Sequence, residues 1–139
     1  MWSPTSKNKI RRIEAVQRRF TKRITGMSNL SYYLRLKELH LESLELRRLR
    51  TDLLTVYKIL SDLLNTSTDV FFTLRAHAHL RGHPHTLNKQ RCTNSVRQSF
   101  FCNRIVNMWN NLPGDTTDFS SFQRFRKSLS SDYLTQLCK

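Results

Sequence analysis

Large apolar residues recur every three or four positions after Ser43, and this period requires a long helix with one wide apolar face. The residues of that face are Leu46, Leu49, Leu53, Val56, Tyr57, Leu60, Leu63 and Leu64. A side chain of this size contributes roughly 1.5–3 kcal/mol when it is buried. We therefore expect a helix that begins at Glu42 or Ser43, ends near Leu64 and forms the centre of the packing.

The rest of the chain also favours helices, because it has only three glycines and three prolines. A first helix is expected from Thr5 or Ser6 to about Arg23, with Gly26 as its stop. A short second helix with Ser31 as its cap follows it. A later helix carries Phe101, Ile105, Met108, Trp109 and Leu112, and a last one, capped by Asp118 or Ser120, carries Phe119, Phe122, Phe125, Leu129 and Tyr133.

These segments predict a mainly α fold, a small helical bundle of about five helices. Residues 1–64 would form a basic helical segment, residues 65–95 an irregular His-rich linker and residues 96–139 a C-terminal helical tail. In the linker, Gly82 and Pro84 favour a loop. A short strand or hairpin near Thr86–Cys92 is the alternative for part of it.

The chain is strongly basic. Its 24 Lys and Arg against 10 Asp and Glu give a formal net charge of +14 and a pI near 10.6. This surplus favours an anionic partner, nucleic acid before a membrane surface, and the alternative is a surface that only keeps the chain soluble. No apolar run approaches the ~18 residues of a membrane span. Cys92, Cys102 and Cys138 are too far apart to suggest a disulfide scaffold, which favours a reducing compartment, the cytosol or the nucleus.

The first expected helix carries the clearest functional signal. At 100° per residue its apolar residues, Ile10, Ile13, Val16, Phe20 and Ile24, form one stripe, and most of its basic residues fall opposite. We expect the stripe to pack inside the molecule while the basic face holds phosphates without reading sequence. The expected phosphate contacts are Arg11, Arg12, Arg18, Arg19, Lys22 and Arg23, followed by Arg47 and Arg48 on the long helix, where Arg50 extends the same surface.

No catalytic pattern is apparent in this sequence. It has no glycine-rich phosphate loop, no paired-aspartate metal motif and no Ser/His/Asp arrangement. The acidic residues of the N-terminal half lie among arginines at helical spacing, where we expect them to temper charge repulsion. They are Glu14, Glu38, Glu42, Glu45 and Asp52.

Histidines cluster in the linker and raise the question of a metal site. They are His77, His79, His83 and His85, with Cys92 nearby. Zinc sites usually contain close cysteine pairs, and none occurs here, so a solvated loop or hydrogen-bonded imidazoles is the favoured interpretation. No metal ligand and no cofactor is predicted. Aromatic residues could also stack on bases, but their helical spacing favours core packing for Phe100, Phe101, Trp109, Phe119 and Phe122.

Several blocks of residues occur in an order that is similar to one family. The blocks are Trp2-Ser3-Pro4, Ile13 to Lys22, Leu30-Ser31-Tyr32, Arg35-Leu36, Leu41 to Arg50, Val56-Tyr57-Lys58, Arg81-Gly82-His83 and Phe100 to Pro113. Together they span nearly the whole chain and resemble the region just after the palm in reverse transcriptases of non-LTR (LINE-like, jockey-type) retrotransposons. The resemblance implies a helical thumb-like segment and tail of an RNA-directed DNA polymerase, which would grip the template–primer duplex.

The same resemblance implies that catalysis lies elsewhere. The palm of this family carries an aromatic-Ala-Asp-Asp metal-binding motif, and no two adjacent aspartates occur in this sequence. We therefore expect a truncated product or the 3′ end of a degenerate element, nuclear if functional, without polymerase activity by itself. Its function would be nonspecific binding of RNA or an RNA–DNA duplex. The alternatives are a module whose basic face docks an acidic protein or the missing polymerase body, and a non-functional relic.

Overall fold

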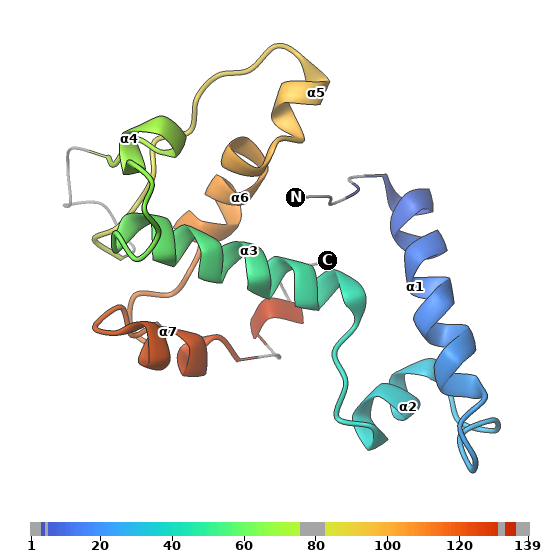
Figure 1. The fold of residues 1–139 in the computed structure, drawn as a ribbon. Coiled ribbons are helices and arrows are strands. Elements are labelled where there is room, and N and C mark those ends of the chain that lie inside the picture. The colour runs from blue at the N-terminus through green and yellow to red at the C-terminus, as the bar shows by residue number, and fades with distance from the viewer. Residues whose placement is uncertain (1–3, 5, 76–82, 131–132, 136–139) are drawn as a thin grey trace.

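The structure, a computed structural model, describes residue 4 and residues 6–75, 83–130 and 133–135, and it is mainly helical, as the sequence predicted (Figure 1). The helices are α1 (Lys7–Lys22), α2 (Tyr32–Glu38), α3 (Leu44–Leu60), α4 (Thr68–Phe71), α5 (Ser95–Gln98), α6 (Phe101–Asn110) and α7 (Phe122–Ser128). The short helices α4 and α5 were not expected. Among the described residues, no helix has the length and apolar character needed to cross a membrane.

Helix α3 lies across the middle of the molecule and packs against α6 and α7 (Figure 1). Leu53 and Val56 are completely buried, and the ring of Tyr57 stacks on Phe125 with centroids 4.6 Å apart. The other buried residues of the core include Leu46, Ile59, Ile105, Val106, Trp109, Leu112 and Leu129. The prediction that this helix forms the centre of the packing is therefore confirmed.

The predicted serine caps of α2 and α3 are confirmed, whereas two other helix ends differ from expectation. The Oγ atoms of Ser31 and Ser43 accept hydrogen bonds from the N–H groups of Leu34 and Leu46, as N-caps do. Helix α3 ends at Leu60, and the chain then turns through Asp62 at a φ of 54°, which leaves Leu63 57% exposed. Leu63 is therefore not part of the buried face, contrary to the prediction.

The cap of the last helix was also predicted wrongly. Helix α7 begins after Ser121, whose Oγ accepts a hydrogen bond from the N–H of Arg124. The carboxylate of Asp118 instead accepts hydrogen bonds from the N–H and hydroxyl of Ser120, which closes a local turn before the helix. Aspartate side chains satisfy turns and caps with the same chemistry, so sequence alone did not separate the two.

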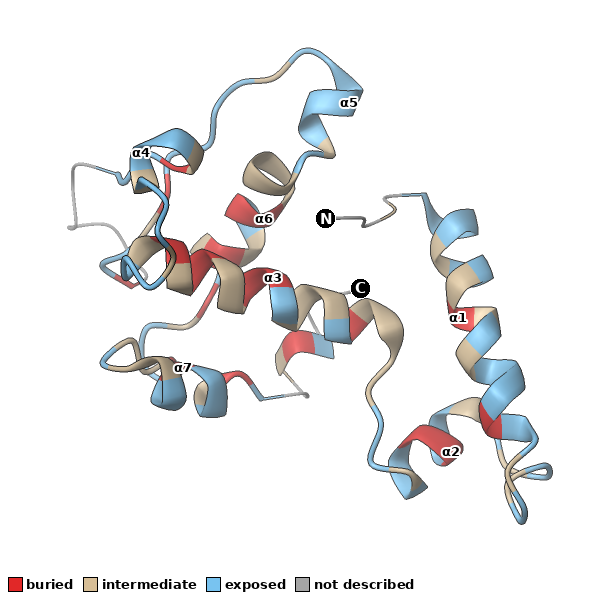
Figure 2. Ribbon diagram, in the orientation of Figure 1, coloured by how far each residue is buried: buried red, intermediate tan, exposed pale blue. Residues whose placement is uncertain are grey.

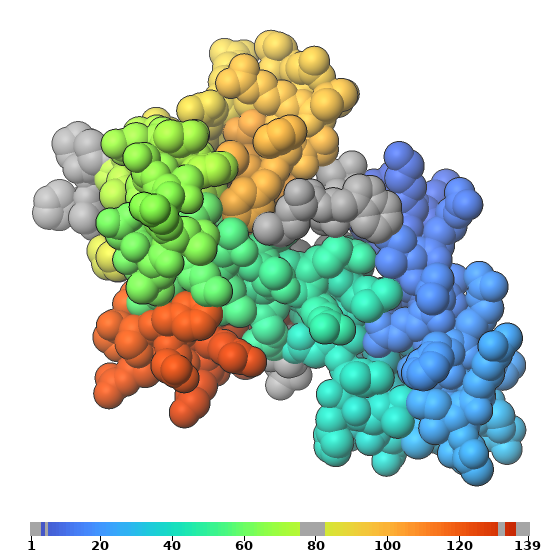
Figure 3. All heavy atoms as spheres, viewed as in Figure 1, coloured from blue at the N-terminus to red at the C-terminus, as the bar shows by residue number. Residues whose placement is uncertain are grey.

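Helices α1 and α2 form one side of the molecule, beside the beginning of α3 (Figure 3). The apolar core built around α3 includes no residue of α1 or α2. Polar contacts join α1 to α2 instead, and the buried guanidinium of Arg35 is at their centre. It donates to the Thr21 hydroxyl at 3.2 Å and to the Leu30 carbonyl oxygen at 2.5 Å. These carbonyl and hydroxyl acceptors satisfy a charged group that would otherwise be costly to bury.

The inner face of α1 differs from the predicted apolar stripe. Its buried residues are Glu14 and Thr21, while Val16 is 63% exposed and Phe20 is 67% exposed. The prediction that Val16 and Phe20 pack inside is therefore wrong. Because Glu14 and Thr21 bond to polar groups on α2 and α3, the helix is rotated away from its apolar stripe. Ile10, Ile13 and Ile24 are only half-buried.

The linker is anchored by one histidine in the core. The ring of His83 is 3% exposed and lies between Trp109 and Phe119, and its Nε2 is 2.8 Å from the carbonyl oxygen of Trp109. Burial lowers the pKa of His83 below its ordinary value. His83 is thus a hydrogen-bonded core imidazole, while His85 is exposed. Among described residues no group of His, Cys, Asp or Glu could hold a metal; His77 and His79 lie outside them.

The expected strand near Thr86–Cys92 is reduced to a single pairing. An antiparallel bridge joins Leu74 to Leu87, and the N–H of Arg75 donates to the carbonyl oxygen of Thr86 at 2.9 Å. Leu87 is fully buried. Its N–H donates to the Oδ1 of Asn110, and its carbonyl oxygen accepts from the Nδ2 of the same side chain. The linker therefore packs against α6 as irregular structure.

Candidate nucleic-acid interface

The basic side chains of α1 lie on the outside of the molecule (Figure 2). All the residues predicted to contact phosphates in this part of the chain are exposed: Arg11, Arg12, Arg18, Arg19, Lys22 and Arg23. We call this set the α1 basic face. The acidic residue of the helix, Glu14, is 8% exposed and lies on the inner side. The rotation of α1 that exposes Phe20 therefore leaves its cations in solvent.

No carboxylate neutralises the α1 basic face within the described part of the chain. The ion pairs there are Arg50–Glu42, Arg104–Asp52 and Arg124–Asp118, and none of them involves α1. The cations repel one another instead. Arg18 lies one turn from Lys22, and Arg19 lies one turn from Arg23. Each such pair destabilises the helix by a few tenths of a kcal/mol, roughly 0.2–0.5. An anion bound along the face would relieve this repulsion.

The length of the α1 basic face corresponds to a short run of phosphates. A helix rises 1.5 Å per residue, so Arg11 and Lys22 are about 16 Å apart along the axis. Phosphates along one strand of a nucleic-acid duplex follow one another at about 3.4 Å of axial rise. The face therefore spans roughly five phosphates of one strand.

The position of Arg18 is fixed by an aromatic contact. Its guanidinium carbon lies 4.9 Å from the centre of the Tyr32 ring, a cation–π arrangement. The Tyr32 hydroxyl in turn donates a hydrogen bond to Glu14 at 2.5 Å. Burial, followed by this hydrogen bond, raises the pKa of Tyr32 far above its ordinary value. Tyr32 therefore stays protonated and neutral beneath Arg18 throughout the physiological pH range.

Glu14 also connects α1 to α3. Its two carboxylate oxygens accept hydrogen bonds from the N–H of Leu44, at 3.2 and 3.1 Å. Leu44 is the first residue of α3, where backbone N–H groups have no partner within the helix and the helix dipole attracts negative charge. Glu14 lies one turn before Arg18 and forms no ion pair with an arginine among the described residues, so the prediction that it tempers their repulsion stays a prediction. Glu14 holds α1 on the N-terminus of α3, and Gln17 Nε2 adds a bond to the Glu42 carbonyl oxygen at 3.0 Å.

Substituting Glu14 with Ala should loosen α1 and α2 without unfolding the core. The change removes an acceptor at a helix N-terminus, an interaction of about 0.5–2 kcal/mol, and leaves the Tyr32 hydroxyl without its partner. We expect amide hydrogen exchange to speed up about tenfold in α1 and α2 and to stay unchanged in α6. Glu38→Ala, which removes an exposed carboxylate from α2, is the matched control. If amide exchange speeds up equally in α1 and α6, the polar contacts of Glu14 are not separate from the core, and the prediction is contradicted.

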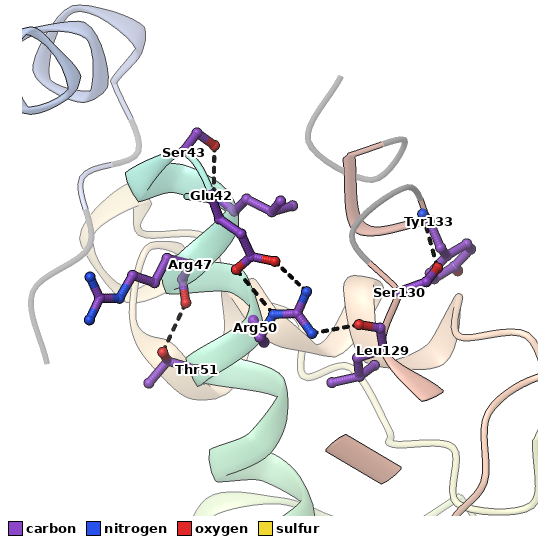
Figure 4. Close-up of polar contacts among 9 residues, drawn as sticks. Glu42, Ser43, Arg47, Arg50, Thr51, Leu129, Ser130 and Tyr133 are labelled. Atoms are coloured by element: carbon purple, nitrogen blue, oxygen red, sulfur yellow. Dashed lines mark hydrogen bonds and ion pairs between the residues drawn. The ribbon is translucent and has the colours of Figure 1, made fainter. Parts of the chain in front are cut away.

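The arginines of α3 lie in different environments (Figure 4). Arg47 is exposed, and its guanidinium points away from the pair that Arg50 forms with Glu42. Arg50 also donates to the carbonyl oxygen of Leu129 at 2.5 Å, which ties α3 to the end of α7. One terminal nitrogen of Arg48, Nη2, is buried without a hydrogen-bond partner. Arg47 is therefore available to a ligand, Arg48 is partly enclosed and Arg50 has a structural role.

A groove of about 970 Å³ is lined by Arg47 and by two cations that sequence reasoning missed, Lys58 and Arg126. Lys58 lies eleven residues after Arg47 in the same helix, close to three full turns, so the helical period could have indicated it. Arg126 comes from α7, and no local pattern in the sequence predicts that α7 crosses α3 at this point. The ammonium group of Lys58 lies 4.9 Å from the ring centre of Phe122.

Comparisons with protein-family models, with curated proteins and with solved structures find no match to this chain.

Proposed function

We propose that this chain binds nucleic acid through the α1 basic face, as a piece of a retrotransposon reverse transcriptase. The ligand is the phosphate backbone of RNA or of an RNA–DNA template–primer duplex, and base sequence is not read. One observation carries the proposal: five exposed cations of α1, together with Arg23 directly after its end, lie on one face of a helix whose single carboxylate is turned inward. Lys and Arg at such spacing displace the counterions that surround a polyanion.

The polymerase assignment is supported by the resemblance of the chain to the region after the palm. A thumb must grip a duplex without sequence preference while the duplex moves, and electrostatic contacts to phosphates meet that need. The chain itself would have no polymerase activity, because the paired aspartates of the palm do not occur in it. Its contribution would be to hold the template–primer, with the polymerase palm as a further partner.

A salt titration of binding tests this proposal. Six displaced counterions predict that the Kd for a fluorescein-labelled RNA–DNA duplex rises by about three orders of magnitude between about 50 and 200 mM salt. Fluorescence anisotropy measures this change, and duplexes of different sequence should give the same slope. A Kd that changes less than about fivefold over this range would contradict phosphate gripping.

A competitor of another class separates this proposal from docking on an acidic protein. Poly-glutamate presents carboxylates at high density but has no phosphate backbone. We expect it to displace the duplex only at a charge concentration at least about tenfold higher than that of unlabelled RNA, because guanidinium groups bind phosphates in well-matched geometry. Equal potency of the two competitors would favour an acidic protein as the natural partner.

A further inference from the structure

Phe20 is an exposed aromatic residue at the edge of a cationic surface. Its side chain is 67% exposed although it belongs to a regular helix, and neither α2 nor α3 covers it. Val16, one turn earlier in the same helix, is 63% exposed. An apolar ring in this position is available to a ligand, and its immediate surroundings indicate which kind.

The residues three and four positions from Phe20 are Val16, Gln17, Ile24 and the basic Arg23, so Phe20 lies at the border between the α1 basic face and the apolar side of the helix. Residues three or four apart are neighbours on a helix, so Arg12, Val16 and Phe20 follow one another in a row, and Arg23 continues it. Arg19 adjoins Phe20 in the chain. All three arginines are exposed, and none forms an ion pair within the described residues. The row therefore places two exposed apolar side chains, Val16 and Phe20, between two exposed cations, Arg12 and Arg23.

We propose that Phe20 stacks on an unpaired base of the strand whose phosphates the α1 basic face holds. This inference rests on the proposed function and narrows its ligand to nucleic acid with a single-stranded segment, such as a template that extends beyond its primer. A base inside a duplex is already stacked on both faces and offers no free ring, whereas every unpaired base does. The flanking arginines Arg12 and Arg23 hold the phosphates on either side of the stacked nucleotide.

The test compares a single strand with a duplex. Anisotropy is measured for a single-stranded RNA of about twelve nucleotides and for a blunt RNA–DNA duplex of the same length. Stacking energies measured by alanine substitution, converted at one tenfold step per 1.4 kcal/mol, correspond to about 5- to 150-fold in affinity. Phe20→Ala should weaken binding of the single strand by this factor and change binding of the blunt duplex less than about twofold. Phe20→Trp, which keeps an aromatic ring, should bind the single strand about as tightly as the wild type does.

Two controls keep the result specific. Phe100 is another exposed phenylalanine, 66% exposed at the start of α6, and Phe100→Ala should leave both affinities unchanged. Because Ala has a higher helix propensity than Phe and Phe20 buries little, Phe20→Ala should leave the far-ultraviolet circular dichroism unchanged. The two phenylalanine variants are thus matched in chemistry and differ in location.

Each outcome decides the matter. If Phe20→Ala weakens binding of the single strand and of the duplex equally, or weakens neither, the stacking role is overturned. The proposed function still stands if charge reversal on α1 abolishes binding. If charge reversal changes nothing, both fail. Binding of the wild type to anionic phospholipid vesicles that is lost in Phe20→Ala, with RNA affinity unchanged, would assign the ring to a membrane surface instead.

Discussion

Reversal of Arg11, Arg12, Arg18 and Arg19 to Glu should abolish duplex binding. The substitutions remove four of the six cations of the α1 basic face and put carboxylates in their place. Each lost phosphate contact lowers the slope of log Kd against log salt by nearly one, so we expect the slope to fall by about three to four. At about 100 mM salt the affinity should fall at least roughly a hundredfold. Anisotropy titration at several salt concentrations measures both quantities.

Reversing the charge of four exposed cations outside α1 tests whether binding depends on one face or only on the net charge of the chain. Arg75, Arg91, Arg97 and Lys127 are exposed and lie outside α1, and their reversal to Glu changes the net charge by the same amount. We expect this variant to lose less than about tenfold in affinity, because exposed charges farther away than a Debye length of about 10 Å are screened. Equal losses in the two variants would mean that no particular face binds the nucleic acid.

Loss of helix structure is not the expected reason for lost binding in the α1 variant. Glu and Arg have similar helix propensities, and the unfavourable charge that Arg19→Glu puts in the last turn of α1 is offset because positions 18 and 19 then face Lys22 and Arg23, one turn later, with opposite charge. The substituted side chains are all exposed, and the packing contact that is lost is the one between Arg18 and the Tyr32 ring. Far-ultraviolet circular dichroism should therefore be unchanged, and a clear drop in helicity would make the binding result inadmissible as support.

The local features of the fold could be predicted because they depend on nearby residues. The period of apolar residues in α3 depends only on helix geometry, and so do the caps at Ser31 and Ser43, which need one oxygen at one position. The exposure of the six α1 cations follows from the cost of burying unpaired charge. These features arise from residues less than a few turns apart.

Features that depend on partners distant in the chain could not be predicted from patterns in the sequence. The inner face of α1 is set by Glu14, which accepts a hydrogen bond from the N–H of Leu44, thirty residues away, and by Arg35, which donates from α2 to the Thr21 hydroxyl. The hydrogen bonds that Glu14 accepts from Leu44 and Tyr32, together with the bond from Arg35 to Thr21, orient α1 so that Val16 and Phe20 stay exposed, although hydrophobic periodicity alone favours their burial. The role of His83 likewise depends on the carbonyl of Trp109 across the fold.

Substituting Asp52 with Ala should be among the most destabilising single changes in this chain. Asp52 in α3 and Arg104 in α6 form an ion pair at 2.5 Å, with their side chains only 7% and 14% exposed. Removing one partner of a buried pair leaves an uncompensated charge in the interior and costs about 3–5 kcal/mol. Chemical denaturation followed by circular dichroism measures the free energy of unfolding, and Arg124→Ala, which breaks the largely exposed pair with Asp118, should cost less than about 1 kcal/mol.

The double variant Asp52→Leu/Arg104→Met shows whether the loss comes from the unpaired charge or from the position itself. Buried ion pairs replaced by apolar residues of similar volume often keep or gain stability, because two desolvation costs disappear together. We therefore expect the double variant to recover most of the stability that Asp52→Ala loses. Both residues lie on the packed surfaces of α3 and α6, outside α1. If the double variant is as unstable as the single one, the contact between these helices depends on the pair itself rather than on the absence of a free charge.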